Sequence, residues 1–301
     1  MNIKALALDL DGTTLMPDNS LGKRTIKVLK ELMADGVELV FCTGRAIEAA
    51  EPYRAALGAE GPMVFFNGAE VVDMPSGKIL EATLLEFDVV DFCIDMSRKM
   101  SVHFQIYVSP GIIEGRDKWE ALLIDKPTRE AEMYSKHTGI IPVVKDLKTL
   151  ISPPFQGGLA SQGGQASQGC IKAMFICEPE WHDEIRAKLS ERFGSRIYVA
   201  RTSPVFLEIM SAGVSKGEGL KTAMKLRGLA KDQVLAAGDE ESDITMFDVV
   251  GFSAAPLNAR ENVKAAADYV FASNAEEGLA SFLEEKILSG NHHTKAPRHK
   301  E

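Results

Sequence analysis

The first third of the chain alternates short, mainly apolar runs with segments whose apolar residues recur at helical spacing. Residues 3–8, 37–42 and 63–66 are runs of strand length. Ser20 predicts the start of a helix that ends at Gly36, and residues 46–57 form a second helical pattern. Apolar strands that alternate with helices indicate a parallel sheet covered on both faces.

The last third of the chain repeats this alternation. The pattern predicts strands at residues 205–210, 233–237, 251–254 and 269–271, and helices at residues 216–226 and 276–288. Because both ends carry the same rhythm, we expect one doubly wound α/β domain with a parallel sheet. Its predicted segments are residues 1–82 and 201–290.

Residues 83–200 carry a different, mixed pattern. Strand-like runs lie at residues 103–108, 140–144 and 171–177, and helical patterns lie at residues 128–137 and 181–193. This mixture predicts a separate α+β lobe that is inserted into the first domain.

Two segments lack the apolar residues that a packed structure needs. Residues 153–169 contain the near-duplicates GGLASQG and GGQASQG, with few apolar anchors. Such a segment cannot offset the entropy cost of ordering, so we expect a flexible surface loop. Residues 291–301 are polar and are expected to form a disordered tail.

Composition narrows the classes of protein and of partner. A length of 301 residues suits two lobes. The net charge of −9, without a basic stripe, argues against nucleic acid as a partner. No apolar run reaches the ~18 residues of a membrane span, so no membrane partner is expected. The four cysteines form no CxxC pair, which favours reduced thiols in a cytoplasmic protein.

Polar clusters follow several predicted strands, at the sheet edge where ligands bind in open α/β sheets. In the first cluster Asp9 and Asp11 stand two residues apart, before Gly12. Carboxylates this close repel unless a proton or a cation such as Mg²⁺ separates them. Asp9 can then attack phosphorus, while Asp11 moves protons. On its own, the cluster fits an ordinary Asp-Gly turn about equally well.

Two further clusters carry groups that bind phosphate. Thr43 and Gly44 offer a hydroxyl and a backbone N–H just before a helix, although both are also ordinary cap and turn residues. Lys216 lies at a predicted helix start, where the helix dipole disfavours a cation, so it suits an anion. An exposed surface lysine is the alternative for this segment alone.

The fourth cluster, at residues 238–243, joins a predicted strand to a helix. Asp239 lies at the junction, where a second metal carboxylate is needed, and Asp243 follows one helical turn later. Asp243 can support the metal through water. Taken together, the clusters supply the groups that phosphoryl transfer needs: nucleophile, acid/base, phosphate donors and metal ligands.

These motifs resemble those of the haloacid dehalogenase superfamily. The resemblance rests on D-L-D-G-T at Asp9, T-G-R at Thr43, G-V-S-K-G at Lys216 and G-D-x-x-x-D at Asp239, and it is greatest with the Cof-like sugar-phosphate phosphatases. It implies a Rossmann-like core with an α/β cap inserted after the third strand. The cap is expected to close over the site and select the leaving group.

The resemblance also implies roles for single residues. Asp9 resembles the nucleophile and metal ligand, and Asp11 the acid/base whose backbone carbonyl also contacts Mg²⁺. Thr43, Gly44 and Lys216 resemble the phosphate binders, and Asp239 and Asp243 resemble the second metal carboxylate and its support. Arg45, Asn67, Ser203 and Ser242 are candidate substrate contacts.

Two positions depart from the family pattern. Ser242 stands where the family usually has Asn, and Pro256-Leu257 stands where it usually has Met-Gly. A serine keeps a hydroxyl donor and loses the second function of the amide. These departures bear on rate and loop geometry more than on the class of reaction.

The predicted function is Mg²⁺-dependent hydrolysis of a phosphorylated sugar or similar small metabolite through an aspartyl-phosphate. The alternatives are a phosphotransferase or mutase of the phosphomannomutase type, and a catalytically silent metabolite-binding module. The same motifs serve the first two, so they do not separate them. The physiological substrate and the oligomeric state are left open.

Overall fold

The computed structural model describes residues 2–110, 112–115, 119–150, 158–160 and 169–289. Backbone contacts divide the chain into two compact units. The first unit takes its residues from Met1–Gly44, Pro52–Gly68 and Ser215–Glu301, and the second from Arg45–Glu51 and Ala69–Val214. The first unit is therefore built from both ends of the chain.

A parallel sheet forms the centre of the first unit. Its strand order is β15-β14-β13-β1-β2, with bounds β1 (Ala5–Leu8), β2 (Glu38–Phe41), β13 (Val234–Ala237), β14 (Phe252–Pro256) and β15 (Tyr269–Phe271). All four neighbouring pairs are parallel. A parallel bridge from Cys42 to Val64 places β3 (Gly61–Phe65) next to β2. The predicted α/β class with a parallel sheet is confirmed.

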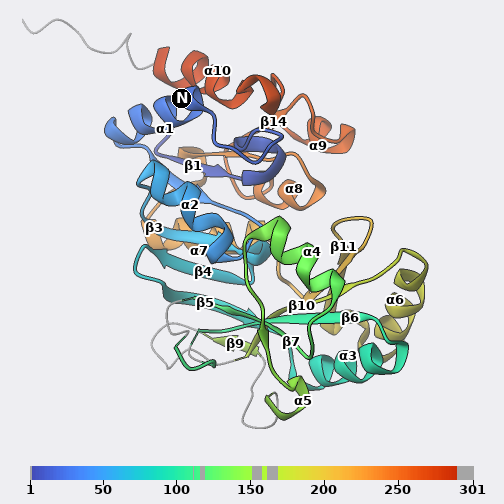
Figure 1. Ribbon diagram of the computed structural model, residues 1–301. Coiled ribbons are helices and arrows are strands. Elements are labelled where there is room, and N and C mark those ends of the chain that lie inside the picture. The colour runs from blue at the N-terminus through green and yellow to red at the C-terminus, as the bar shows by residue number, and fades with distance from the viewer. Residues whose placement is uncertain (1, 111, 116–118, 151–157, 161–168, 290–301) are drawn as a thin grey trace, which may run out of the picture. The chain divides into compact units, whose positions relative to one another are not determined.

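Helices cover the central sheet of the first unit. They are α1 (Lys23–Ala34), α7 (Lys216–Arg227), α8 (Glu241–Phe247), α9 (Glu261–Ala266) and α10 (Gly278–Leu283). Helix α1 packs beside α10, and α8 packs between α7 and α9. Figure 1 shows α10 and α8 on opposite sides of strand β1. Helix α2 (Ile47–Leu57) contributes residues to both units.

The prediction that Ser20 starts the first helix was wrong. Helix α1 begins at Lys23, after Gly22. The carboxylate Oε2 of Glu277 accepts hydrogen bonds from the Thr25 backbone N–H at 2.7 Å and from its hydroxyl at 3.1 Å. A side chain from the last third of the chain therefore satisfies one of the open N–H groups of this helix, which no local pattern reveals.

A second, mainly antiparallel sheet forms the second unit. Its strand order is β11-β12-β10-β6-β7-β8, with bounds β6 (His103–Val108), β7 (Ala121–Ile124), β8 (Val143–Val144), β10 (Cys170–Ile176), β11 (Ile197–Arg201) and β12 (Phe206–Ser211). Its helices are α3 (Phe87–Met100), α4 (Arg129–Thr138), α5 (Leu147–Leu150) and α6 (Glu180–Phe193). Apolar side chains of α3 and α6 pack on strands β6, β10 and β12 and form one core.

Several predicted strands differ from those in the structure. The strand predicted at residues 205–210 forms, but as β12 it pairs antiparallel with β10 and β11 and does not join the parallel sheet. The run at residues 140–144 yields only the two-residue strand β8. Strands β4 (Glu70–Met74) and β5 (Lys78–Leu84) carry charged residues among the apolar ones, and the apolar pattern missed them.

Part of the low-complexity segment is regular. Gly158–Ala160 forms strand β9, which pairs antiparallel with β5, so the expectation of a loop throughout residues 153–169 was wrong for these three residues. Backbone hydrogen bonds of a strand do not require apolar side chains. Residues 153–157 and 161–168 and the predicted tail at residues 291–301 lie outside the described residues.

Two further observations concern the cysteines and the lengths of the helices. All four cysteines are free and buried. Within the described ranges, no helix combines the length and the apolar character that crossing a membrane would require.

Candidate active site

Asp9 begins a tight turn directly after strand β1. Its backbone is extended, and residues 10–14 then form a single π-helical turn in which Gly12 has φ 72°. The Thr14 hydroxyl donates to the Asp9 carbonyl at 2.6 Å. A Cβ atom on Gly12 would lie 2.2 Å from Asp239 Oδ2, so only glycine fits between this turn and the next carboxylate.

Lys216 lies in the first turn of helix α7 and contacts two buried carboxylates. Its Nζ lies 2.6 Å from Asp9 Oδ1 and 2.6 Å from Asp243 Oδ1. The Ser215 hydroxyl accepts from the Glu218 backbone N–H at 3.2 Å and caps the same helix. The two carboxylates therefore offset the unfavourable position of a lysine at a helix N-terminus.

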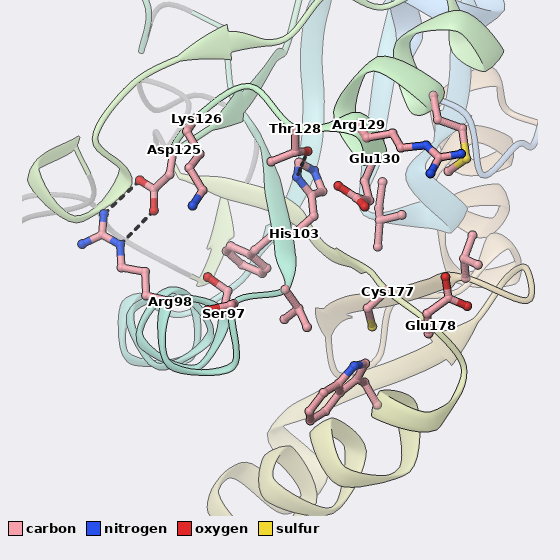
Figure 2. Close-up of a pocket in the computed structure, with 17 residues that line it drawn as sticks. Ser97, Arg98, His103, Asp125, Lys126, Thr128, Arg129, Glu130, Cys177 and Glu178 are labelled. Carbon is pink, nitrogen blue, oxygen red and sulfur yellow. Dashed lines mark hydrogen bonds and ion pairs between the residues drawn. The ribbon is translucent and has the colours of Figure 1, made fainter.

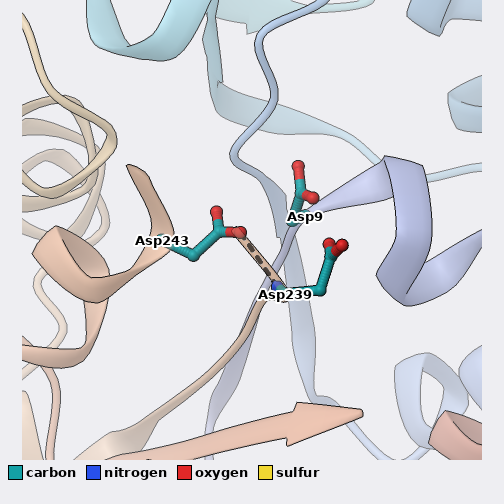
Figure 3. A group of neighbouring side chains, drawn as sticks. All are labelled: Asp9, Asp239 and Asp243. Carbon is teal, nitrogen blue, oxygen red and sulfur yellow. Dashed lines mark hydrogen bonds between the residues drawn. The ribbon is translucent and has the colours of Figure 1, made fainter. Parts of the chain in front are cut away.

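The loop after strand β13 brings Asp239 and Asp243 to the same place. Asp243 Oδ2 accepts from the backbone N–H groups of Asp239 at 3.0 Å and of Glu240 at 2.9 Å. The Thr13 hydroxyl donates to Asp239 Oδ1 at 2.9 Å. Figure 3 shows the three aspartates turned toward one another. Asp243 thus fixes the loop that carries Asp239 and also contacts Lys216.

The three aspartates form a buried acidic group. One ligand oxygen from each of Asp9, Asp239 and Asp243 lies within 4.8 Å of the others. Burial and the neighbouring Asp243 raise the pKa of Asp9 well above its usual value. Burial raises the pKa of Asp239 to about 6, and the nearby negative charge of Asp243 acts in the same direction. Burial opposes the charge on Lys216, but Asp243 and Asp9 outweigh it and raise the pKa of the lysine.

This group suits a hard divalent cation. Lys216 contacts two of the three carboxylates, so the four groups together carry an excess of negative charge when all are ionised. A divalent ion would offset this excess, and carboxylate oxygens are the ligands that Mg²⁺ prefers. Asp239 has one oxygen bonded to Thr13, and its other oxygen faces Gly12. The residues present therefore fit a metal ion.

Thr43 and Gly44, in the loop after β2, contact Asn67, in the loop after β3, within the first unit. The Thr43 backbone N–H donates to the Val64 carbonyl at 3.0 Å, and the Asn67 N–H donates to the Thr43 carbonyl at 3.0 Å. A Cβ atom on Gly44 would lie 2.8 Å from Asn67 Oδ1. Asn67 has φ 55°, a conformation that asparagine tolerates better than most residues. The residues predicted to bind phosphate and substrate here thus lie in two loops that contact each other.

The other three candidate substrate contacts are Arg45, Ser203 and Ser242. Arg45 and Ser203 belong to the second unit, and their role as substrate contacts stays a prediction. One guanidinium nitrogen of Arg45 donates to the Ala49 carbonyl at 3.4 Å, and the Ser203 hydroxyl accepts from the Phe206 backbone N–H at 3.1 Å. Ser242 lies in the first turn of α8, where its carbonyl accepts from the Thr245 hydroxyl at 2.7 Å.

Asn258 is a positioning residue to which sequence reasoning assigned no role. Its Nδ2 donates to the Gly12 carbonyl at 2.8 Å, and its Oδ1 accepts from the Asn274 backbone N–H at 3.0 Å. It therefore ties the Asp9 turn to the segment that follows strand β15. Its position shortly after β14 was a signal, because polar residues at strand ends supply the other groups of this site.

The chain is similar to known hydrolases over nearly its whole length. The family model of the haloacid dehalogenase-like hydrolases matches residues 6–283. A 5-amino-6-(5-phospho-D-ribitylamino)uracil phosphatase of Bacillus subtilis (strain 168) is 27% identical over 285 residues, covering 93% of this chain and 96% of that protein. The pyridoxal phosphate phosphatase of Escherichia coli (strain K12) is 23% identical over 297 residues, covering 96% and 100%. The crystal structure of a haloacid dehalogenase-like hydrolase from Bacteroides thetaiotaomicron matches with a TM-score of 0.80 and 23% identity, over 94% of this chain and 99% of that one.

Proposed function

Because the chain belongs to the haloacid dehalogenase-like hydrolases and is a phosphatase, we propose that it hydrolyses phosphate monoesters of small metabolites by covalent catalysis at Asp9. The observation that carries the proposal is the buried group in which Lys216 lies 2.6 Å from both Asp9 and Asp243, next to Asp239. Such a group combines a nucleophile with the charges that a phosphoryl group requires.

In the first step a carboxylate oxygen of Asp9 attacks phosphorus. The ester P–O bond breaks, and Asp11 donates a proton to the leaving oxygen. In the second step Asp11 takes a proton from water as the water attacks phosphorus. The P–O bond to Asp9 then breaks and inorganic phosphate leaves. The exposed position of Asp11, two residues after buried Asp9, suits a group that exchanges protons with water.

The charged neighbours prepare this chemistry. The Asp9 and Asp239 carboxylates and the Asp11 carbonyl would hold Mg²⁺, which when bound neutralises charge on the phosphoryl oxygens. Lys216 orients the Asp9 carboxylate through its 2.6 Å contact and contributes positive charge. Asp243 keeps the Asp239 loop in place through its two backbone hydrogen bonds. Thr43 and Gly44 would bind the remaining phosphoryl oxygens.

The proposed substrates are sugar phosphates and similar small phosphorylated metabolites. Two relatives that cover nearly the whole chain are named for pyridoxal phosphate and for a phosphorylated ribityl compound, and both are phosphate esters of small polar molecules. The second unit would select the leaving group, as a cap does when it excludes water from a phosphoryl-transfer site. The phosphotransferase reaction uses the same first step and differs only in the final acceptor.

The test is a phosphate-release assay over sugar phosphates, nucleotides and cofactor phosphates, with Mg²⁺ or with EDTA. We expect release that depends on Mg²⁺ and that Asp9→Asn abolishes, because an amide cannot accept the phosphoryl group. Asp248→Asn makes the same change at an exposed position of the first unit and should keep full activity. Normal turnover in Asp9→Asn would defeat the covalent mechanism. Phosphate that appears only on an added acceptor would favour the phosphotransferase. No turnover with any phosphate ester would favour a catalytically silent binding module.

A further inference from the structure

The second unit holds a cavity of about 550 Å³ at one end of its six-stranded sheet. Its walls come from the last turn of α3, the first turns of α4 and α6, and the ends of strands β6, β7, β10 and β12. None of the residues proposed above for catalysis or substrate binding lines it. The volume falls within the range of ~300–1,000 Å³ that is common for small-molecule sites.

A buried hydrogen-bonded histidine stiffens the back of this cavity. The His103 ring lies 2.7 Å from the Thr128 hydroxyl through Nδ1 and 3.0 Å from Gln105 Oε1 through Nε2. Thr128 also caps helix α4 by accepting from the Ala131 backbone N–H at 3.1 Å. Burial lowers the pKa of His103, which favours a neutral ring that accepts from Thr128 and donates to Gln105. These bonds hold the backbone at the start of α4, the helix that carries Glu130.

Charges of both signs line the cavity without neutralising one another. Arg98 is already bound to Asp125 and to Asp146. Within the described part of the chain, the side chains of Lys126, Arg129, Glu130 and Glu178 form no ion pair or hydrogen bond with another residue. In Figure 2, Lys126 and Glu130 lie on opposite sides of the His103–Thr128 pair. The cavity thus offers a separated cation and anion, and the four unpaired side chains have no net charge.

An apolar surface completes the cavity. Trp181 is 39% exposed and Met133 is 44% exposed, although both are large apolar side chains. Phe104 and Ile176 belong to the same lining and are buried. Exposed indole and thioether groups favour contact with an apolar or aromatic ring.

We propose that this cavity binds a free α-amino acid with an aromatic or large aliphatic side chain. Lys126 would pair with the carboxylate of the amino acid, Glu130 with its ammonium group, and Trp181 would pack on its side chain. A ligand with both charges satisfies the two separated charges at once. A purely anionic ligand would pair with the cations and leave Glu130 and Glu178 without a partner.

The experiment is isothermal titration calorimetry of the full-length protein with L-phenylalanine. Three probes each remove one feature of the ligand: N-acetyl-L-phenylalanine lacks the ammonium group, L-phenylalaninamide lacks the carboxylate, and glycine lacks the side chain. We expect L-phenylalanine to bind and each of the three probes to bind at least tenfold more weakly. No binding of L-phenylalanine at millimolar concentration would overturn the proposal, and so would equal binding of the blocked probes.

Two variants test the assigned residues. Lys126→Met and Glu130→Gln should each weaken L-phenylalanine binding at least tenfold. Lys136→Met and Glu132→Gln make the same changes at exposed positions of α4 outside the cavity lining and should bind like the unmodified protein. Unchanged thermal melting and phosphatase turnover would show that all four variants are folded. Inorganic phosphate that binds and is lost in Lys126→Met alone would identify an anion site and refute the amino acid.

Discussion

Replacement of Lys216 by methionine tests how the buried charges of the first unit stabilise one another. Lys216 is 3% exposed, and it lies 2.6 Å from both Asp9 and Asp243. Methionine keeps an apolar stem of similar length but leaves these carboxylates without their ammonium partner. Breaking a buried ion pair in this way costs about 3–5 kcal/mol. We expect the free energy of unfolding to fall by about that amount in EDTA.

The chain supplies a matched control within the same helix. Lys221 lies 2.6 Å from Glu218 Oε1, as short as the Lys216 contacts, but the two side chains are 54% and 60% exposed. A surface pair contributes about 0–1 kcal/mol. Lys221→Met should therefore change the free energy of unfolding by less than about 1 kcal/mol. Urea denaturation followed by circular dichroism measures both variants under the same conditions.

Magnesium is expected to offset part of the loss in the Lys216 variant. A divalent cation among the carboxylates would take over part of the charge that Lys216 supplies, and a ligand that binds only the folded state stabilises it. The deficit of Lys216→Met should therefore shrink when Mg²⁺ replaces EDTA. Equal losses in the Lys216 and Lys221 variants would refute the assigned role of burial. A deficit that Mg²⁺ leaves unchanged would refute the shared cation site.

Three other changes have expected outcomes. Gly12→Ala would place a Cβ 2.2 Å from Asp239 Oδ2 and displace that carboxylate, so phosphate release should fall about 100-fold. Burial raises the pKa of Glu120 from 4.5 to about 7, so the folded state binds an extra proton in this window and stability falls as pH rises through it. Glu120→Gln should remove about 3 kcal/mol of this pH dependence between pH 4.5 and 7, measured by urea denaturation. Glu277→Ala removes the hydrogen bonds to Thr25 at the start of α1 and should cost about 1 kcal/mol in the same assay.

Each of these changes has a control in the chain. Gly36→Ala also substitutes a glycine with positive φ, but a Cβ there meets no atom within 4 Å, so turnover should persist. Glu132→Gln is exposed and should leave the pH dependence intact, and Glu276→Ala should leave α1 intact. A loss of turnover in both glycine variants would contradict the steric argument. A pH profile unchanged by Glu120→Gln would contradict the assigned proton.

The sequence predicts strands better than it predicts which strands pair. The apolar run at residues 103–108 appears as β6 with the predicted bounds. The run at residues 205–210 is mainly apolar too, but it lies in the antiparallel sheet as β12, where it pairs with β10 and β11. An apolar run predicts that a strand is buried, but it does not identify the strands or helices that pack against it.

The proximity of Asp9 and Asp239, by contrast, could be predicted from the sequence. Strands β1 and β13 are parallel neighbours, so Asp9 and the Asp239 loop leave the sheet at the same edge. A prediction of both strands as parallel neighbours therefore also predicts that these acids lie close together. The bond from Lys216 to Asp243 and the bond from Asn258 to the Gly12 carbonyl depend on side-chain geometry across long sequence separations. No periodicity along the chain carries that information.

The pairing of Ala5 with Val234 has a consequence for the order in which the protein is made. While the ribosome is still synthesising the last third, strand β1 has only one of its two sheet neighbours. Every strand of the antiparallel sheet lies before residue 215, so that sheet can form first as the nascent chain emerges. Strand β1 therefore waits for β13 to be translated before its own sheet can close.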